Sequence, residues 1–340
     1  MIDLNNILEN AKYVAILGHI RPDGDCVGSC MGLYNYIEAN YEGIKSDVYL
    51  NPIPGCFSIF ANAKKIVNYT GFDLLESIDD FPKCVQGSYV RKEPYDVVFA
   101  LDCSDKKRLG PAYPIFKNAK KTICIDHHMN CDGFADIDYI IPDYSSTCEL
   151  LFDIFDYEKI DKNVAECLYT GMVTDTGVFQ YDCTESHTMD AAGKLMDKGI
   201  DFSYLIEHTF YEKTYNQQRI LGVALQKSKL TYNNKIIYSY IEADEMEEYK
   251  VNTKDFEGVC EKMRETKGVG VAFFMYRQND GKIKGSLRGT ANVDLSRVAG
   301  NLNGGGHKKA AGFTLGNIKM EDAVEKVIEE IIKEYEIGNN

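Results

Sequence analysis

The chain has 340 residues, of which 44% are hydrophobic and 11% aromatic, and its formal net charge is −14. This length predicts two domains, each with its own core. The acidic charge excludes a protein that coats long nucleic acids through bulk positive charge, although a short nucleotide can still bind at one local basic site.

The cysteines and the N-terminus bear on the cellular compartment. Eleven cysteines, an odd number without a Cys-x-x-Cys pair, indicate neither a disulfide framework nor a structural zinc site. The first residues lack the charged and apolar segments of a signal peptide. No apolar run approaches the roughly 18 residues that are needed to span a bilayer. We therefore expect a protein of the reduced cytoplasm, without a membrane partner.

The first part of the chain alternates apolar runs with helical segments. Strands are predicted at 13–17, 46–50, 96–101 and 122–125, and helices at 25–38, 162–174 and about 187–198. Because near-continuous apolar strands separated by helices are typical of parallel sheets, we predict an α/β domain with helices on both faces of its sheet. Ser145-Ser146-Thr147 is a predicted helix cap before residues 149–155. The polar segment 79–93 is predicted to be a surface excursion.

A second, smaller α/β domain is predicted in the last third of the chain. The predicted division is a first domain at 1–200, a helical connector at 201–227 and a second domain at 228–340. Two hairpins are predicted, at 229–242 and at 269–287, because Asn-rich turns separate their apolar runs. Helices at 253–264 and 320–335 are predicted to cover this sheet.

Ionisable side chains follow three of the predicted parallel strands. His19, Asp102 and the run Asp126-His127-His128 each come directly after an apolar segment, and Asp23 and Asp25 follow His19 in a tight loop. Since ligands bind beyond the carboxyl ends of parallel strands, one crevice can collect these groups. Imidazoles and carboxylates without thiolates suit manganese, iron, cobalt or zinc. So many ligands suit two ions about 3.5–4 Å apart, with one carboxylate bridging them.

Each of these residues also has an ordinary structural explanation. A histidine after a strand is more often a hydrogen-bonded surface or core residue than a metal ligand. Asp23 lies in a Pro-Asp-Gly sequence that is typical of turns. Asp102 can act as a helix cap. The occurrence of all of them at successive strand ends favours the metal hypothesis.

These motifs resemble those of the DHH phosphoesterase superfamily. Residues 19–29 resemble its first motif, Leu101-Asp102 its second, Asp126-His127-His128 the motif that names it, and residues 171–177 its fourth. The glycine-rich segment 304–312 is similar to part of the DHHA1 domain that follows in many members. The fold therefore resembles a DHH domain with a parallel sheet, followed by a smaller α/β DHHA1 domain.

The resemblance implies a role for each matching residue. His19 and Asp23 would hold one metal, Asp25, His127 and Asp175 the other, and Asp102 would bridge the two. The family most often uses Mn²⁺. His128 is implied as the proton donor near the transferred phosphate, and Asp126 would orient its neighbours. A hydroxide between the two ions would attack phosphorus.

A basic and glycine-rich set is a candidate for substrate binding. Gly304, Gly305 and Gly306 allow backbone amides to approach a phosphate, and His307, Lys308 and Lys309 add cationic donors, although such a run is more often a flexible turn. The resemblance implies that Arg288 and His307 grip the nucleotide. Arg108, six residues after Asp102, is a weaker phosphate candidate that is more typical of a surface residue.

The architecture favours one branch of the superfamily. RecJ-type exonucleases would be longer, membrane-type cyclic-dinucleotide phosphodiesterases carry N-terminal spans, and manganese pyrophosphatases end in a different domain. The remaining resemblance is to the stand-alone bacterial nano-RNases, which implies hydrolysis of short RNA, of linear dinucleotides such as pApA and pGpG, and of 3′-phosphoadenosine 5′-phosphate. The alternatives are a manganese-dependent inorganic pyrophosphatase and a non-catalytic nucleotide-binding regulator. Long nucleic acid is not an expected partner, and a homodimer is left open.

Overall fold

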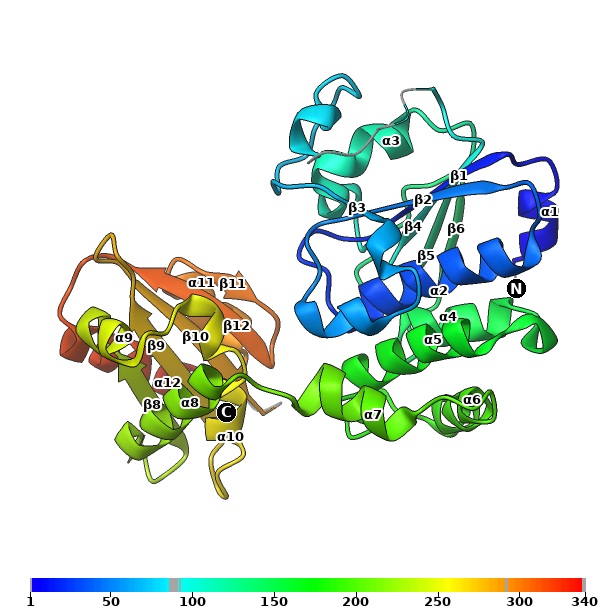
Figure 1. The fold of residues 1–340 in the computed structure, drawn as a ribbon. Coiled ribbons are helices and arrows are strands. Elements are labelled where there is room, and N and C mark those ends of the chain that lie inside the picture. Colours follow the sequence, from blue (N-terminus) through cyan, green and yellow to red (C-terminus); the bar gives the residue numbers. More distant parts are fainter. Residues whose placement is uncertain (1, 86–90, 92, 291–292, 338–340) are drawn as a thin grey trace. The chain divides into compact units, whose positions relative to one another are not determined.

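The computed structural model describes residues 2–85, 91, 93–290 and 293–337, and the chain divides into two compact units, Met1–Glu212 and Lys213–Asn340 (Figure 1). Unit 1 is built on a six-stranded parallel sheet with the order β3-β2-β1-β4-β5-β6. Its strands are β1 (Tyr13–Leu17), β2 (Lys45–Leu50), β3 (Ile66–Asn68), β4 (Val97–Leu101), β5 (Thr122–Asp126) and β6 (Ile137–Ile140). The four predicted strands and their parallel arrangement are confirmed, whereas the edge strands β3 and β6 were not predicted.

Helices cover both faces of this sheet, as predicted (Figure 1). Alternate residues of β1 enter different cores, because successive side chains of a strand point to opposite faces. Val14 and Ile16 pack with α2 (Gly24–Asn40), α4 (Thr147–Ile154) and α5 (Lys162–Asp175). Ala15 and Leu17 pack with α3 (Tyr113–Lys117) and the 3-10 helix η4 (Lys106–Ala112).

Close packing of α2 on α5 depends on small residues. A Cβ atom on Gly28 would lie 2.6 Å from the carbonyl oxygen of Cys167, so the two backbones can approach only because this residue is glycine. The predicted helix cap is confirmed, since Ser146 accepts a hydrogen bond from the backbone N–H of Glu149. The remaining helices of unit 1 are α1 (Leu4–Leu8), α6 (Ser186–Met196), α7 (Phe202–Ile206), a π-helix η6 (Glu207–Tyr211), and the 3-10 helices η1 (Gly55–Ile59), η2 (Ala63–Lys65), η3 (Phe81–Cys84) and η5 (Tyr157–Lys159).

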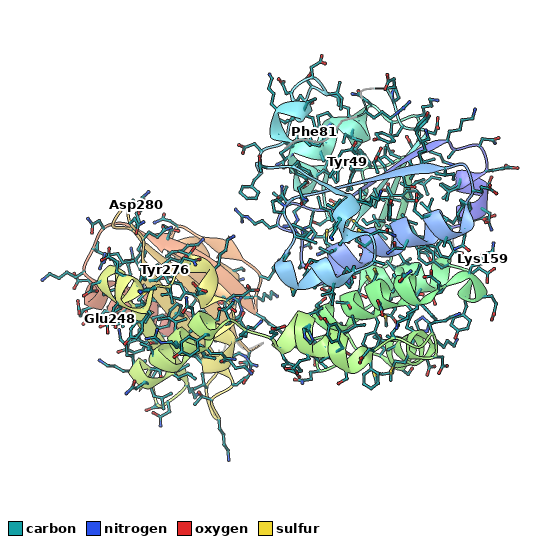
Figure 2. All side chains as sticks on the ribbon, in the orientation of Figure 1. Tyr49, Phe81, Lys159, Glu248, Tyr276 and Asp280 are labelled. Atoms are coloured by element: carbon teal, nitrogen blue, oxygen red, sulfur yellow. The ribbon has the colours of Figure 1, made fainter. Side chains whose placement is uncertain are left out.

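The segment predicted as a surface excursion contributes to the core. Phe81 is fully buried, and its ring lies 5.6 Å from that of Tyr49 and 5.7 Å from that of Tyr69. Figure 2 shows Tyr49 and Phe81 close together in unit 1. The prediction is therefore wrong for Phe81, and residues 86–90 and 92 of the segment lie outside the described residues.

Unit 2 contains a mixed six-stranded sheet with the order β11-β12-β10-β9-β8-β7. Its strands are β7 (Lys229–Thr231), β8 (Ile236–Ile241), β9 (Val271–Arg277), β10 (Ile283–Gly289), β11 (Gly305–Gly306) and β12 (Ala310–Leu315). Both predicted hairpins are confirmed, because β7 pairs with β8 and β9 with β10 in antiparallel fashion. β8 and β9 are parallel to each other, and the chain between them forms a crossover.

Helices lie on both faces of this second sheet. α11 (Leu295–Asn301) and α12 (Met320–Ile337) pack on one face, and α8 (Tyr215–Lys227) and α10 (Val259–Arg264) on the other. The predicted helix 253–264 is interrupted, because Gly258 has a left-handed φ of 84° between η7 (Thr253–Phe256) and α10. The crossover also contains α9 (Ala243–Tyr249). No helix among the described residues is both long and apolar enough to cross a membrane.

Candidate active site

Three neighbouring strands of unit 1 carry polar side chains just beyond their carboxyl ends. β1 is followed by His19, β4 by Asp102, and β5 ends at Asp126 before His127. β1 pairs with β4, and β4 pairs with β5, all in parallel. Because parallel neighbours end at the same edge of a sheet, this order brings the three motifs together.

The first group of ligand atoms surrounds the imidazole of His19. Its Nε2 lies 3.4 Å from Oδ2 of Asp102 and 3.6 Å from Oδ1 of Asp23. Nδ1 lies 2.9 Å from the carbonyl oxygen of Ile20, to which it can donate a hydrogen bond. This bond leaves Nε2 as the atom that faces the carboxylates.

The second group surrounds the imidazole of His127. Its Nε2 lies 3.2 Å from Oδ2 of Asp175, 3.7 Å from Oδ1 of Asp102 and 3.8 Å from Oδ2 of Asp25. Nδ1 lies 3.3 Å from the carbonyl oxygen of Tyr144. Asp102 therefore directs one carboxylate oxygen toward each histidine, which is the arrangement that a bridging ligand requires.

Asp25 is held by backbone donors that sequence reasoning missed. The N–H groups of Thr147 and Cys148, at the start of α4, donate to its two oxygens over 2.7 Å and 2.9 Å. The predicted cap at Ser145-Ser146-Thr147 was the available signal, because a helix N-terminus presents free N–H groups. Asp25 lies at the start of α2, so this contact also joins α2 to α4.

Carboxylates crowd this site. The side chain of Asp25 is 1% exposed and that of Asp102 is 3% exposed. Burial, together with the charges of Asp102 and Asp175, raises the pKa of Asp25 well above its usual value. Burial lowers the pKa of His127, but its hydrogen bond to Asp175 and the nearby carboxylates outweigh this effect and raise it to about 10. Carboxylates that repel one another in this way favour bound cations.

Asp126 and His128 form a hydrogen-bonded pair beside these groups, and Nδ1 of His128 also lies 3.5 Å from Oδ1 of Asp102. Oδ1 of Asp126 accepts hydrogen bonds from the backbone N–H groups of His127 and His128, and lies 2.7 Å from Nδ1 of His128. This contact raises the pKa of His128 and directs its Nε2 away from Asp126. The imidazole of His128 is 40% exposed, so it is accessible to a substrate.

A thiol also lies among the ligand atoms, although the sequence-based metal hypothesis contained none. Cys26, His19 and Asp102 offer atoms within 4.8 Å of one another, and Sγ of Cys26 accepts a hydrogen bond from the backbone N–H of His19. Burial raises the pKa of the Cys26 thiol well above its usual value. A protonated thiol is a poor metal ligand, so the imidazole and carboxylate set remains the better fit.

The candidate phosphate-binding residues are divided between the units. Arg288 lies at the end of β10 opposite Ala310 of β12, next to the turn that contains the exposed His307. Its Nε donates to Oε1 of Glu261 over 2.6 Å. Arg108 lies in unit 1, where its carbonyl oxygen accepts a 2.7 Å hydrogen bond from the N–H of Ile20, next to His19.

The glycine run is part of the sheet. Gly305 and Gly306 form β11, which pairs with Gly312 and Ala311 of β12. A Cβ atom on Gly304 would lie 2.0 Å from the carbonyl oxygen of Gly312, so the backbones touch at this edge. The glycines thus have a packing role besides the predicted phosphate contact.

Comparisons with known proteins cover most of the chain. The model of the DHH family, N-terminal domain, matches residues 13–172, and the model of the DHHA1 domain matches residues 233–334. The "bifunctional oligoribonuclease and PAP phosphatase NrnA" of Thermus thermophilus is 25% identical over 96% of this chain and 91% of the relative. The protein of the same name from Bacillus subtilis is 24% identical, with 94% of both chains covered. The crystal structure of an exopolyphosphatase-related protein from Bacteroides fragilis is 26% identical over 99% of this chain and 96% of its own, with a TM-score of 0.86.

Proposed function

The chain belongs to the DHH/DHHA1 family of hydrolases, and we propose that it is a two-metal phosphoesterase that cleaves short oligoribonucleotides and linear dinucleotides, such as pApA and pGpG, to mononucleotides. We further propose that it removes the 3′-phosphate of 3′-phosphoadenosine 5′-phosphate. The names of the relatives from Thermus thermophilus and Bacillus subtilis support both activities.

The observation that carries this proposal is the position of Asp102 between two imidazoles, 3.4 Å from His19 and 3.7 Å from His127. His19, Asp23 and Asp102 would hold one divalent ion, and Asp25, His127, Asp175 and Asp102 the other. Nitrogen and oxygen donors of this kind suit Mn²⁺. The two ions, when bound, would lower the pKa of water and screen the charge of the phosphate.

The protein's own residues would position the reactants and move a proton. The two backbone N–H groups of α4 fix both oxygens of Asp25, so this carboxylate keeps its orientation. Asp126 fixes the ring of His128 through Nδ1, which leaves Nε2 to give a proton to the leaving oxygen. The hydrogen bond to Asp126 raises the pKa of His128, which favours the protonated imidazole that can supply this proton.

The substrate would be held by its phosphates. In unit 2, Arg288 and His307, with the backbone of Gly304, Gly305 and Gly306, would bind a nucleotide. In unit 1, Arg108 would contact a phosphate. These are few cations on a chain with a net charge of −14, which favours short substrates over a long polyanion.

The test is an assay of the purified protein with Mn²⁺ on pApA, 3′-phosphoadenosine 5′-phosphate and inorganic pyrophosphate. We expect release of AMP from the first two and slow turnover of the third. A preference for pyrophosphate would instead identify a pyrophosphatase. Tight nucleotide binding without hydrolysis under any divalent ion would identify a regulator and contradict the proposal.

A further inference from the structure

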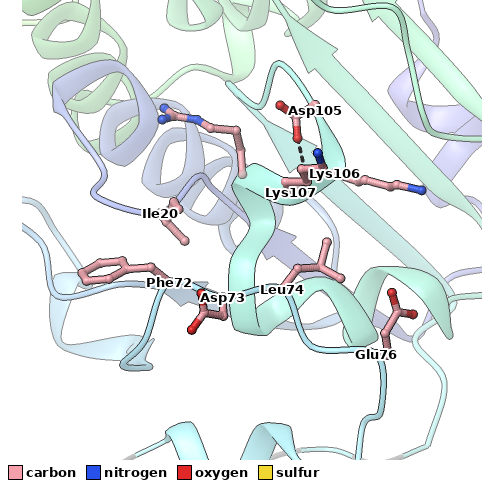
Figure 3. Close-up of a pocket in the computed structure, with 9 residues that line it drawn as sticks. Ile20, Phe72, Asp73, Leu74, Glu76, Asp105, Lys106 and Lys107 are labelled. Carbon is pink, nitrogen blue, oxygen red and sulfur yellow. Dashed lines mark hydrogen bonds between the residues drawn. The ribbon is translucent and has the colours of Figure 1, made fainter. Parts of the chain in front are cut away.

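A pocket of about 480 Å³ opens in unit 1 beside the His19 group (Figure 3). Ile20, which follows His19, lines the pocket together with Phe72 and Arg108. Ile20 and Phe72 lie next to each other along one edge in Figure 3. The volume lies in the range of small-molecule sites, about 300–1,000 Å³.

We propose that this pocket binds the second nucleoside of a linear dinucleotide, with its base against Phe72. The inference rests on the proposed function, and it assigns a subsite that the metal ligands and the residues of unit 2 do not supply. The nucleoside in question is the one that pApA has and that 3′-phosphoadenosine 5′-phosphate lacks.

Phe72 has the properties of a stacking residue. Its side chain is 50% exposed, so packing in the core does not account for it. The guanidinium carbon of Arg21 lies 4.7 Å from the ring centroid, which places a cation over one face. An exposed aromatic ring beside a cation offers a base both π-stacking and charge complementarity.

One buried side chain fixes both Arg21 and the segment that leads to Phe72. Asn51 is 2% exposed, and its Oδ1 accepts a 3.1 Å hydrogen bond from the backbone N–H of Arg21. Its Nδ2 donates to the carbonyl oxygens of Tyr69 and Gly71 over 3.0 Å and 3.2 Å. Arg21 has a left-handed φ of 57°, which this contact helps to maintain. The stacking surface is therefore pre-organised.

Arg108 supplies a cation that is free to contact a phosphate. Its side chain makes no hydrogen bond or ion pair with the other residues that the structure describes. Its backbone is tied to Ile20, so the residue is anchored next to the His19 group. Arg108 would contact the phosphate that links the two nucleosides.

The rest of the pocket lining carries charges of both signs. Asp73, Glu76 and Asp105 line it together with Lys106 and Lys107, and Glu76 is paired with Lys117 over 2.7 Å. The hydroxyl groups of an uncharged terminal nucleoside can form hydrogen bonds with both kinds of side chain.

The two proposed substrates differ in the feature that the pocket would recognise. In both, water adds to the phosphorus on the 3′-oxygen of the first nucleoside, the P–O3′ bond breaks, and the 3′-oxygen takes up a proton. The phosphorus leaves as inorganic phosphate from the bisphosphate, and as the 5′-phosphate of the second nucleoside from pApA. A substitution that impairs the pocket should therefore slow the hydrolysis of pApA and leave that of the bisphosphate unchanged.

The experiment compares kcat/KM for both substrates in Phe72→Ala, Phe72→Tyr and a control, Phe202→Ala, which removes another exposed phenylalanine of unit 1 (41% exposed). We expect Phe72→Ala to lower kcat/KM for pApA on the order of 10-fold. For the bisphosphate, kcat/KM should stay within about twofold of the wild-type value. Phe72→Tyr, which keeps a ring, and Phe202→Ala should behave as the wild type on both substrates.

Equilibrium binding separates this inference from the proposed function. Binding of pApA and of the bisphosphate is measured with Ca²⁺ as the only divalent ion, while product formation is monitored in parallel. Weaker binding of pApA alone by Phe72→Ala supports the subsite even if the wild type hydrolyses neither compound. If Phe72→Ala weakens the binding of both ligands equally, or changes the binding of neither, the proposed subsite is contradicted.

Discussion

Oδ2 of Asp175 lies 3.2 Å from Nε2 of His127, so the end of α5 meets the edge of the sheet at the centre of the site. Burial and the charge of Asp102 raise the pKa of Asp175 to about 6, even though His127 acts against this rise. In the absence of an ion, the protonated imidazole of His127 thus supplies a positive charge in contact with this carboxylate. A metal that binds here must displace that proton.

Metal affinity should therefore rise with pH. Because the pKa of His127 is about 10 in the metal-free protein, metal binding between about pH 7 and pH 9 should release protons. Calorimetric titration with Mn²⁺ in buffers of different ionisation enthalpy measures the number released. An affinity that is constant over this range, with no proton release, would contradict the assignment of His127 as a ligand.

Asp102→Asn should strongly reduce the stabilisation of the protein by bound metal. Asparagine tolerates the left-handed backbone of Asp102, whose φ is 57°, so the fold should be kept. Saturating Mn²⁺ should stabilise the wild type by about 4 kcal/mol at 1,000 times Kd, and the variant much less. Activity should fall by at least about 100-fold. Thermal unfolding with and without Mn²⁺ is the measurement, and circular dichroism checks the fold.

Glu149→Gln should weaken metal binding without touching a ligand. The side chain of Glu149 is 2% exposed, and its Oε2 accepts hydrogen bonds from Ser145 and Thr188. These bonds fix the loop whose Tyr144 carbonyl oxygen contacts His127. We expect a loss of about 1–3 kcal/mol in the free energy of unfolding and about 10-fold in Mn²⁺ affinity.

The matched control for this prediction is Glu158→Gln, which changes an exposed glutamate of the same unit. It should leave both quantities unchanged. If Glu149→Gln lowers stability but binds Mn²⁺ like the wild type, the residue supports the fold alone and does not position His127.

Substitutions of Arg288 and of Glu261 should change the affinity for substrate in opposite directions. Because Glu261 competes with phosphate for the guanidinium group, Glu261→Gln should release Arg288 and lower KM for pApA by about twofold to fivefold. Arg288→Ala should raise KM by about 10-fold or more, with a small change in kcat. Steady-state kinetics of both variants decide the matter, and a kcat effect that exceeds the KM effect would argue against a binding role.

Asp96 should make the free energy of unfolding depend on pH in a way that does not involve metal binding. Its oxygens accept hydrogen bonds from the backbone N–H groups of Lys12 and Tyr13 and from Lys120. Burial opposes these contacts, but together they hold the pKa of Asp96 below its usual value of 3.8. The stabilisation is therefore present above pH 3.8 and is lost as the pH falls through the lower pKa of the folded state.

Asp96→Asn should thus lower the free energy of unfolding by about 1 kcal/mol at pH 7, and the difference from the wild type should shrink toward pH 3. Urea unfolding at several pH values measures it. Asp190→Asn, at an exposed position, is the control. A difference that grows in acid would mean that the sign is wrong.

The sequence predicted the parts of the fold that depend on local patterns. Apolar runs that are followed by His19, Asp102 and Asp126 were sufficient to predict three strands and their polar ends. A buried strand is a short apolar run, and the polar residues directly after it mark where the strand stops. β3 and β6 were missed, since three or four residues at the edges of a sheet carry little periodicity. The left-handed Gly258 interrupts what looked like one helix.

The contacts that position the site could not be predicted in the same way. The N–H of Thr147 reaches Asp25 across 122 residues, and Glu261 reaches Arg288 across 27. Neither pair follows from spacing, because tertiary packing brings the partners together. Glu149 looked like an ordinary helical glutamate, since the sequence does not reveal which glutamate of a helix is buried.

Asn51 has a consequence for the pocket as a whole. Its one amide group links the turn after β1 to the strand-end segment after β3, so a displacement of either strains hydrogen bonds in the other. A molecule that binds against Phe72 would therefore restrict the motion of Arg21, and through Arg21 the motion of the loop that carries Asp23. Binding in the pocket and ordering of the metal-binding side chains would then be coupled.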